Sequence, residues 1–268
     1  MLTPIRLTGS SLAVREIDDE TTRIAPFDVR VLITGESGVG KQTIARLIHE
    51  RSRRANRPFV TIDCGAVADS TFESEWLAPL TDAGGTLFLR GAEQMSAHQQ
   101  RALHRYLESA YEAHGAVRPS LRVLAGSRIG LFEAVEAGTF RRDLFYRLNT
   151  VHICVPPLRE RIEDVPMLFD HFVREIADTQ HCAAPYVAAE TEQALLAYSW
   201  PDNVRELKQV AKRLVMKGGD QRADGRMPAG HVRFESVGVK RPVHALPPDG
   251  PVIGTPLLRP VAPPRTTS

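Results

Sequence analysis

Residues 29–54, VRVLITGESGVGKQTIARLIHERSRR, determine the architecture of this chain. The first six of them, Val29–Thr34, form an apolar run of strand length. In Lys41–Arg54 the apolar residues recur at helical spacing, at Ile44, Ala45, Leu47 and Ile48. The glycine-rich segment GESGVGK, Gly35–Lys41, lies between the two. We therefore expect a buried strand, a tight loop and a helix in succession.

This order of elements is the context in which a Gly-x4-Gly-Lys loop binds phosphate. Glycines allow the backbone N–H groups to point inward, and the helix N-terminus adds a partial positive charge. Such loops commonly continue with a Ser or Thr that binds magnesium, but this chain has Gln42. The alternative is a glycine-rich turn that binds nothing. The candidate nucleotide-binding residues are Gly35, Glu36, Ser37, Gly38, Val39, Gly40, Lys41 and Gln42.

The rest of the chain divides by its pattern of apolar residues. Further strand-like runs occupy residues 58–64, 86–90, 121–127 and 151–156, with a helical pattern at 97–108. Strand signals then cease, and helical patterns cover residues 162–177, 188–198 and 203–217. Alternation of strands and helices predicts an α/β domain with a parallel sheet, residues 1–157, before a small helical domain, 158–217. Nine prolines in residues 227–268 predict a disordered proline-rich tail over 218–268.

Composition excludes several classes of protein. The 268 residues are 43% hydrophobic and 25% charged, which is ordinary for a globular protein. These values argue against a wholly disordered chain, a coiled coil and a small disulfide-rich protein. A net charge of +2 gives no electrostatic footprint for duplex DNA. No apolar run approaches the length of a membrane span and no leader is recognisable, so we expect a cytoplasmic protein without a membrane partner. Cys64, Cys154 and Cys182 lie far apart, which predicts reduced buried thiols and no metal site.

Seven blocks resemble one family over about residues 7–217. In consistent order, they are similar to the AAA+ central domain of the bacterial sigma-54-dependent transcription activators, also called enhancer-binding proteins. The blocks are TGSSLAVREI (8–17), VLITGESGVGKQTIARLIHERSRRANRPFVTIDC (31–64), FESE (72–75), GGTLFL (84–89), FRRDLFYRLN (140–149), PPLRERIEDVP (156–166) and SWPDNVRELKQV (199–210).

The resemblance implies an AAA+ P-loop fold with a helical lid, acting in transcription regulation. It implies that ATP or ADP binds between the subunits of a ring, with residues 8–17 beside the adenine and residues 35–42 at the phosphates. Arg205 matches the second sensor of the family. Arg141 and Arg147 match arginines that a neighbouring subunit directs at the γ-phosphate, where a guanidinium can stabilise charge. The alternative for these arginines, with Arg142, is a solvated helix face.

The chain departs from the family at the positions that perform hydrolysis. One carboxylate normally positions magnesium and a second orients the attacking water. The family pattern GGTLFLDE is here GGTLFLRG, so Arg90 and Gly91 stand at the two acidic positions. Two positions that are usually Asn are Asp63 and Arg128. If the strands take the order that the family uses, the third strand lies between the second and the fourth. We then expect Asp63 to pair with Arg90 and Arg128 to face the nucleotide, so that cationic side chains partly take the place of the metal. The need for Mg²⁺ stays open, and no catalytic set is expected to be intact.

An internal deletion is the second departure. Family members carry a long insertion with the GAFTGA loop, which contacts sigma-54, but here only residues 76–83 join FESE to GGTLFL. A direct sigma-54 contact is therefore not expected. Trp76 and Leu77 are interpreted as facing the core rather than a partner. No segment after Lys217 resembles the family's helix-turn-helix, so direct DNA binding is not expected either.

Three functions follow from these observations. The first is a non-hydrolysing AAA+ module that binds nucleotide and self-associates or joins mixed rings with AAA+ activators. The second is a residual ATPase that uses Asp63 or Glu93 in place of the lost acids. The third is a decayed relative with no retained biochemical role. Whether the chain is an enzyme stays open at this point.

Overall fold

A five-stranded parallel sheet forms the centre of the computed structural model, which describes residues 7–77, 83–112, 121–128, 130–187 and 189–220. The strands lie in the order β2-β3-β4-β1-β5. The expected position of the third strand between the second and the fourth is therefore confirmed. Their bounds are β1 Val31–Thr34, β2 Phe59–Asp63, β3 Thr86–Arg90, β4 Arg122–Ser127 and β5 Val151–Cys154.

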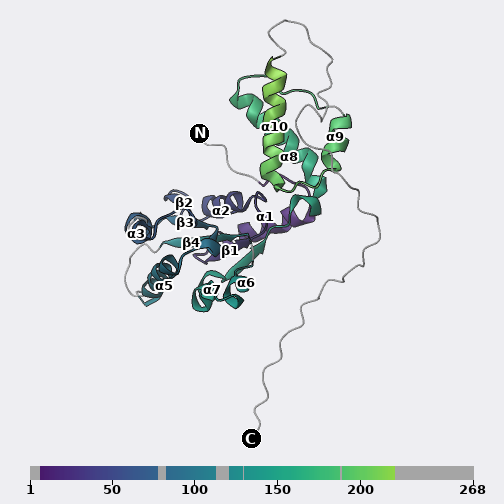
Figure 1. Cartoon of the computed structure of the whole chain (residues 1–268). Helices are drawn as coiled ribbons and strands as arrows, with labels where there is room; N and C mark the ends of the chain where they lie inside the picture. The colour runs from purple at the N-terminus through teal and green to yellow at the C-terminus, as the bar shows by residue number, and fades with distance from the viewer. Residues whose placement is uncertain (1–6, 78–82, 113–120, 129, 188, 221–268) are drawn as a thin grey trace.

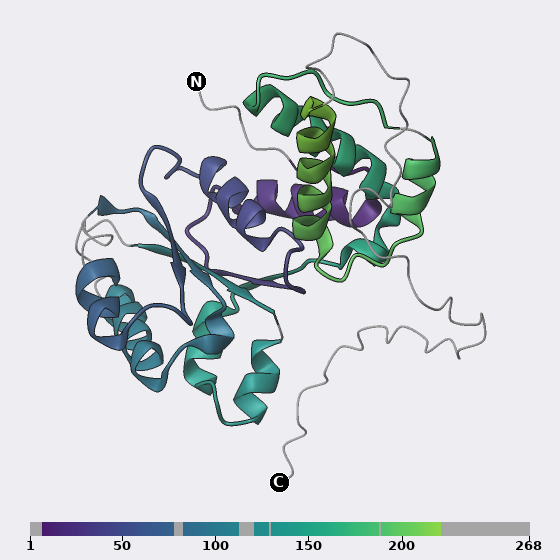
Figure 2. The same ribbon diagram turned by 45° about the horizontal axis from the view of Figure 1, so that its top comes forward.

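Helices cover both faces of this sheet (Figures 1 and 2). Successive residues of a strand point to opposite faces. Leu32 and Leu87 belong to a core cluster shared with α5, α6 and α7, whereas Val31 and Phe88 belong to one shared with α1 and α2. The helices are α1 Leu12–Ile24, α2 Lys41–Glu50, α3 Asp69–Thr71, α5 Ala97–Glu112, α6 Leu131–Glu136 and α7 Arg142–Leu148, with short turns η1 Phe72–Leu77 and η2 Ala92–Gln94.

A helical lid follows β5 and lies at one end of the sheet (Figure 1). Its elements are η3 Leu158–Glu160, η4 Ile162–Asp164, α8 Val165–Thr179, α9 Ala189–Leu196 and α10 Asn203–Asp220. They enclose a hydrophobic core of their own, in which the Trp200 side chain is fully buried. The predicted fold class, an α/β parallel sheet with a small helical lid, is confirmed. The expected proline-rich tail lies almost entirely in residues 221–268, outside the described residues.

Several predicted boundaries differ from those observed. The helix expected over residues 41–54 ends at Glu50. There the Ser52 hydroxyl donates to the His49 carbonyl and accepts from the Arg54 N–H, a local arrangement that competes with helix continuation. The last helix runs three residues past the expected end at Lys217, to Asp220.

Burial corrects one prediction and confirms another. Cys64 is buried, but Cys182 is half-buried and Cys154 is exposed, so the expectation of three buried thiols is wrong. Cys154 lies on the edge strand β5, whose alternate residues face away from the core. Leu77 is buried and Trp76 packs against the same core cluster, as predicted. Among the described residues, no helix has the length and apolar character needed to cross a membrane.

A buried arginine joins the sheet to the end of α1. The Arg122 side chain donates from Nη1 to the Ala25 carbonyl at 2.9 Å, and from Nη2 and Nε to the Ile24 and Val29 carbonyls at 3.3 Å each. The last carbonyls of a helix have no partner within the helix, and they carry its negative dipole end. Burial lowers the pKa of Arg122 to about 10, so the guanidinium remains charged at neutral pH.

Replacing this guanidinium should destabilise the fold. Arg122→Met keeps the apolar stem but leaves buried carbonyls unpaired, and we expect the free energy of unfolding to fall by about 2–4 kcal/mol. Urea denaturation followed by circular dichroism measures the change. Arg101→Met, on an exposed face of α5, is the matched control and should stay within about 0.5 kcal/mol of the unaltered chain. Equal stability of the two variants would contradict this assignment.

Candidate functional site

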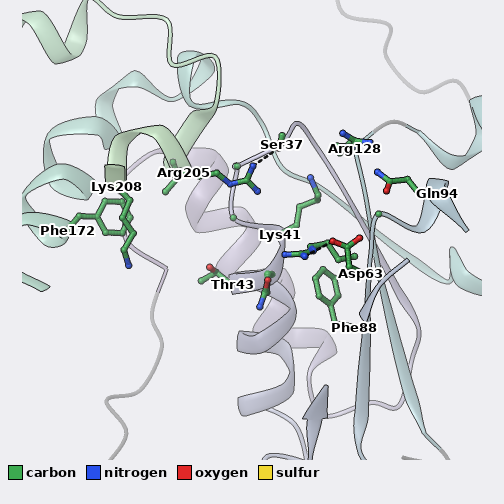
Figure 3. Close-up of a pocket in the computed structure, with 16 residues that line it drawn as sticks. Ser37, Lys41, Thr43, Asp63, Phe88, Gln94, Arg128, Phe172, Arg205 and Lys208 are labelled. Atoms are coloured by element: carbon green, nitrogen blue, oxygen red, sulfur yellow. Dashed lines mark hydrogen bonds and ion pairs between the residues drawn. The ribbon is translucent and has the colours of Figure 1, made fainter. Parts of the chain in front are cut away.

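A pocket of about 540 Å³ opens where the strands end, between the glycine loop and the lid (Figure 3). Parallel α/β sheets bind ligands at this edge. Lys41 lies between lid residues Arg205 and Lys208 on one side and Asp63 and Arg128 on the other (Figure 3). The lining residues are Ser37, Gly38, Gly40, Lys41, Gln42, Thr43, Asp63, Phe88, Arg90, Gly91, Gln94, Arg128, Phe172, Val204, Arg205 and Lys208.

The glycine loop is shaped by its close approach to the lid. Gly38 has a φ of +78°, in the left-handed region that favours glycine. A Cβ atom on Gly38 would lie 2.1 Å from the Asp202 carbonyl oxygen. The Arg205 N–H also donates to the Gly38 carbonyl at 3.2 Å. The absence of a side chain at Gly38 therefore permits the lid to pack directly on the loop backbone.

Lys41 is the first residue of α2, directly after the loop. Its ammonium group donates to the Gly35 carbonyl at 2.6 Å and to the Glu36 carbonyl at 2.8 Å. The pKa of Lys41 is lowered to about 8, mainly by burial; the carboxylate of Glu93 opposes this shift, and the positive charges of Arg128 and Arg205 add to it. This ammonium group therefore lies at the pocket wall, where burial has made its charged form less favourable.

Two lid residues at the start of α10 form hydrogen bonds with the glycine loop. The buried Asn203 side chain donates to the Ser37 carbonyl at 3.0 Å and to the Glu36 carboxylate at 3.2 Å. Its side-chain oxygen accepts from the Leu158 N–H at 2.6 Å, which ties the loop to both ends of the lid. Arg205 donates from Nη1 to the Ser37 hydroxyl at 3.0 Å (Figure 3).

The segment around η3 supplies two more contacts. Arg159 forms a two-pronged ion pair with Glu36, at 2.7 and 2.8 Å. The Arg159 hydrogen bonds, followed by that from Asn203, lower the pKa of Glu36 to about 2. The buried Arg161 donates to the Val39 carbonyl at 3.0 Å. Glu36 and Val39 therefore serve the junction with the lid and do not line the pocket.

A buried carboxylate fixes the N-terminal segment to the lid. Asp164 is fully buried and accepts from the Ser10 N–H at 2.6 Å, the Ser11 N–H at 2.8 Å and the Ser11 hydroxyl at 2.7 Å. Ser11 is also the N-cap of α1, because its side chain accepts from the Val14 N–H. The segment that the resemblance places beside an adenine is thereby anchored to the first turns of the lid.

The ends of β2 and β3 carry the first altered positions. Asp63 and Arg90 are directly opposite each other in the parallel ladder, and Arg90 Nη2 donates to Asp63 Oδ2 at 2.6 Å. The predicted Asp63–Arg90 pair is therefore present. Gly91 follows with a φ of +72°, a conformation that L side chains rarely adopt. A glutamate at this position would require either strain or a different local backbone.

Arg128, after β4, makes a contact that was not predicted. It lines the pocket as expected, but its Nε donates to Glu93 Oε1 at 3.0 Å. The Glu93 side chain is only 8% exposed. Arg128 therefore holds the Glu93 carboxylate in a fixed position beside the pocket.

The structure brings together most of the predicted site residues, but not all. Ser37, Gly38, Gly40, Lys41, Gln42, Asp63, Arg90, Gly91, Arg128 and Arg205 line one pocket, whereas Gly35, Glu36 and Val39 do not. Arg141 and Arg147 also lie elsewhere, at the start of α7 and within it. Arg141 pairs with Asp143 and Arg147 with Glu108 at 3.2 Å. In the described residues, neither arginine contacts the pocket of its own chain.

Sequence reasoning missed the residues that join the loop to the lid. Arg159, Arg161 and Asp164 lie in the block PPLRERIEDVP, and Asn203 precedes the helix of SWPDNVRELKQV. Both blocks were recognised, but their polar residues were not connected to the loop. The density of charged residues in an otherwise apolar segment was the available signal. Their partners lie more than 120 residues away in the sequence.

Comparison with known families agrees with this geometry. The family described as "Sigma-54 interaction domain" matches residues 7–79 and 80–154, and the "AAA+ ATPase lid domain" matches residues 159–226. The break between the first two ranges falls inside residues 76–83, where the expected insertion is missing.

Individual relatives match more than three quarters of the chain. The C4-dicarboxylate transport transcriptional regulatory protein DctD of Pseudomonas aeruginosa is 38% identical, over 83% of this chain and 53% of DctD. The regulatory protein AtoC of Escherichia coli is 37% identical, over 77% of this chain and 49% of AtoC. The chain thus spans about half the length of these curated relatives.

Solved structures show the same similarity. The crystal structure of NtrX from Brucella abortus in complex with ADP superposes with a TM-score of 0.76 at 31% identity, over 87% of this chain and 55% of NtrX. The ATP complex of NtrX gives a TM-score of 0.75 over 86% of this chain. The family ranges and these matches together show that the chain belongs to the sigma-54 interaction domain family of AAA+ proteins.

Proposed function

We propose that this chain binds ATP or ADP without hydrolysing it and acts in transcription regulation by associating with AAA+ subunits in the cytoplasm. The observation that carries the proposal is an intact phosphate loop facing a β3 strand that ends in Arg90 rather than in an acid. In this proposal residues 1–157 bind the nucleotide, residues 158–217 form the lid and residues 218–268 form a tail.

Nucleotide binding is supported by the loop and its surroundings. The backbone of residues 35–41 and the Lys41 ammonium provide donors for phosphate oxygens. Arg205 reaches the same loop from the lid, through Ser37. The NtrX structures hold ADP and ATP on a fold of the same kind. We therefore assign the backbone of residues 35–42 and the side chains of Lys41 and Arg205 to the nucleotide.

Loss of hydrolysis is supported by the contacts of the remaining carboxylates. An arginine can neither accept a proton from water nor coordinate a cation at accessible pH. Asp63 accepts from Arg90 at 2.6 Å and Glu93 accepts from Arg128 at 3.0 Å, so both candidate replacements already bind guanidinium groups. These contacts argue against the alternative of a residual ATPase that uses either acid. The well-formed pocket argues against a decayed fold with no ligand.

Association would use the arginines that lie away from the pocket. Arg141 and Arg147 are half-exposed on α7, beside the exposed aromatic ring of Tyr146. In this proposal they reach the nucleotide of a neighbouring subunit, either in a ring of this chain or in a mixed ring with an AAA+ activator. The missing insertion between Glu75 and Gly84 leaves direct contact with sigma-54 out of the proposal.

Lys41 gives nucleotide binding a defined pH dependence. The pKa of Lys41 is about 8 in the free protein, and bound phosphate would raise it because the anion favours the charged ammonium. Affinity for ATP should therefore be highest below pH 8 and fall as the pH rises toward 9.5. Calorimetric titration at several pH values measures this trend. Lys41→Ala should abolish binding, whereas Lys212→Ala on the exposed face of α10 should not. A flat profile up to pH 9.5 would count against this role of Lys41.

Phosphate release tests the absence of hydrolysis, and mixing tests association. The purified chain should release phosphate from ATP at the rate of the buffer alone.

Added to a relative that retains both acids of the GGTLFLDE pattern, the chain should change that relative's ATPase rate in a ratio-dependent manner. The double variant Arg141→Ala, Arg147→Ala should lose this effect, and Arg174→Ala, on the exposed face of α8, should keep it.

Two results would contradict this proposal. Turnover by the chain alone that disappears in Lys41→Ala would show that hydrolysis is retained. An unchanged rate of the relative at every ratio would show that the chain does not act through mixed rings.

A further inference from the structure

The pocket residues do not fit the divalent cation that the AAA+ fold implies. Magnesium prefers oxygen ligands, usually one or two carboxylates together with phosphate oxygens and waters. Among the described residues that line this pocket, Asp63 is the single carboxylate, and Arg90 donates to it at 2.6 Å. The two positions that would supply acids are Arg90 and Gly91, and the position after Lys41 is Gln42.

Arg90 can contact an anion while it pairs with Asp63. Its side chain is 53% exposed and lines the pocket. Within the described part of the chain, its guanidinium makes one hydrogen bond, from Nη2 to Asp63. A guanidinium carries five N–H donors in a planar fork that matches phosphate oxygens. The pair with Asp63 therefore orients the group without exhausting its donors.

Arg128 is oriented in the same manner from the neighbouring strand β4. Its Nε binds Glu93, which holds the side chain in place, and the side chain remains 55% exposed at the pocket wall. Among the described residues, no hydrogen bond occupies its terminal Nη atoms. Asp63 and Glu93 thus each position one guanidinium, at the ends of β3 and β4, where a metal ligand is expected.

The charge of the pocket favours an anion that carries no metal. Its described lining residues include five cations, Lys41, Arg90, Arg128, Arg205 and Lys208, against one carboxylate, Asp63. Two of these cations also pair with carboxylates outside the lining, Arg128 with Glu93 and Lys208 with Glu175, and the set remains cationic. A divalent cation would be repelled by this set, because like charges in a partly desolvated site interact strongly. ATP without magnesium carries more negative charge than its magnesium complex and so gains more from the same cations.

We infer that this pocket binds a nucleoside triphosphate or diphosphate as the metal-free anion, with the Arg90 and Arg128 guanidinium groups in the place of a divalent cation. The inference rests on the proposed nucleotide binding and specifies the ionic form of the ligand. It assigns Asp63 and Glu93 as positioning residues for the two arginines rather than as metal ligands.

Calorimetric titration of the full chain with ATP and with ADP, in excess EDTA and in excess Mg²⁺, tests this inference. The Kd in EDTA should be equal to or lower than the Kd in Mg²⁺. Arg90→Asp places a second carboxylate beside Asp63, and it should weaken binding in EDTA by about tenfold, the loss of roughly one hydrogen bond between charged groups. Its affinity should then rise when Mg²⁺ is added, opposite to the unaltered chain.

Two further variants separate this effect from a general loss of charge or of folding. Arg105→Asp reverses the charge of an exposed side chain that pairs with Glu73 away from the pocket. This variant should leave both Kd values unchanged. Arg128→Gln should weaken binding in EDTA without restoring a response to Mg²⁺, because no carboxylate is added. Circular dichroism checks that each variant is folded.

The outcomes distinguish this inference from the proposed function. Binding that requires Mg²⁺ in the unaltered chain would overturn the inference and leave nucleotide binding in place. An Arg90→Asp variant that binds in EDTA as tightly as the unaltered chain would also overturn it. No binding of ATP or ADP under either condition would overturn both.

Discussion

The contact between the glycine loop and the lid is the constraint on which the site depends. Asn203 binds Ser37 and Glu36 at the loop and Leu158 at the start of the lid. The glycine at position 38 allows this approach, because any side chain there would collide with the Asp202 carbonyl. Since the same loop presents Lys41 to the pocket, the shape of the pocket and the position of the lid are set together.

The opposite wall of the pocket is built from the ends of β2, β3 and β4. The parallel ladder places Asp63 beside Arg90, and the turn after β3 brings Glu93 to Arg128. Each acid has one arginine partner, so both carboxylates are engaged, while Arg90 and Arg128 keep guanidinium donors at the pocket. In the function proposed here, the loop side of the pocket binds the nucleotide, whereas this wall lacks the free carboxylates that would activate water.

Much of the fold followed from local patterns in the sequence. The apolar run at Val29–Thr34, the glycine loop and the periodic helix after it predicted the strand, loop and helix that are observed. Periodicity could not predict where that helix ends, because Ser52 terminates it through hydrogen bonds to its own neighbourhood. It also could not predict that Cys154 is exposed, because this depends on β5 lying at the edge of the sheet.

The residue types at the pocket could be predicted from the sequence. The glycine loop followed by Lys41, and Arg90 in the place of an acid, are both recognised within short stretches of the chain. The Asp63–Arg90 pair could be predicted once the strand order was assumed, since register places them opposite each other. The Glu36–Arg159 and Ser11–Asp164 contacts could not, because their members are 123 and 153 residues apart. Only the packing of the lid against the sheet brings such residues together, and no pattern within a short stretch of sequence predicts which distant residues will meet.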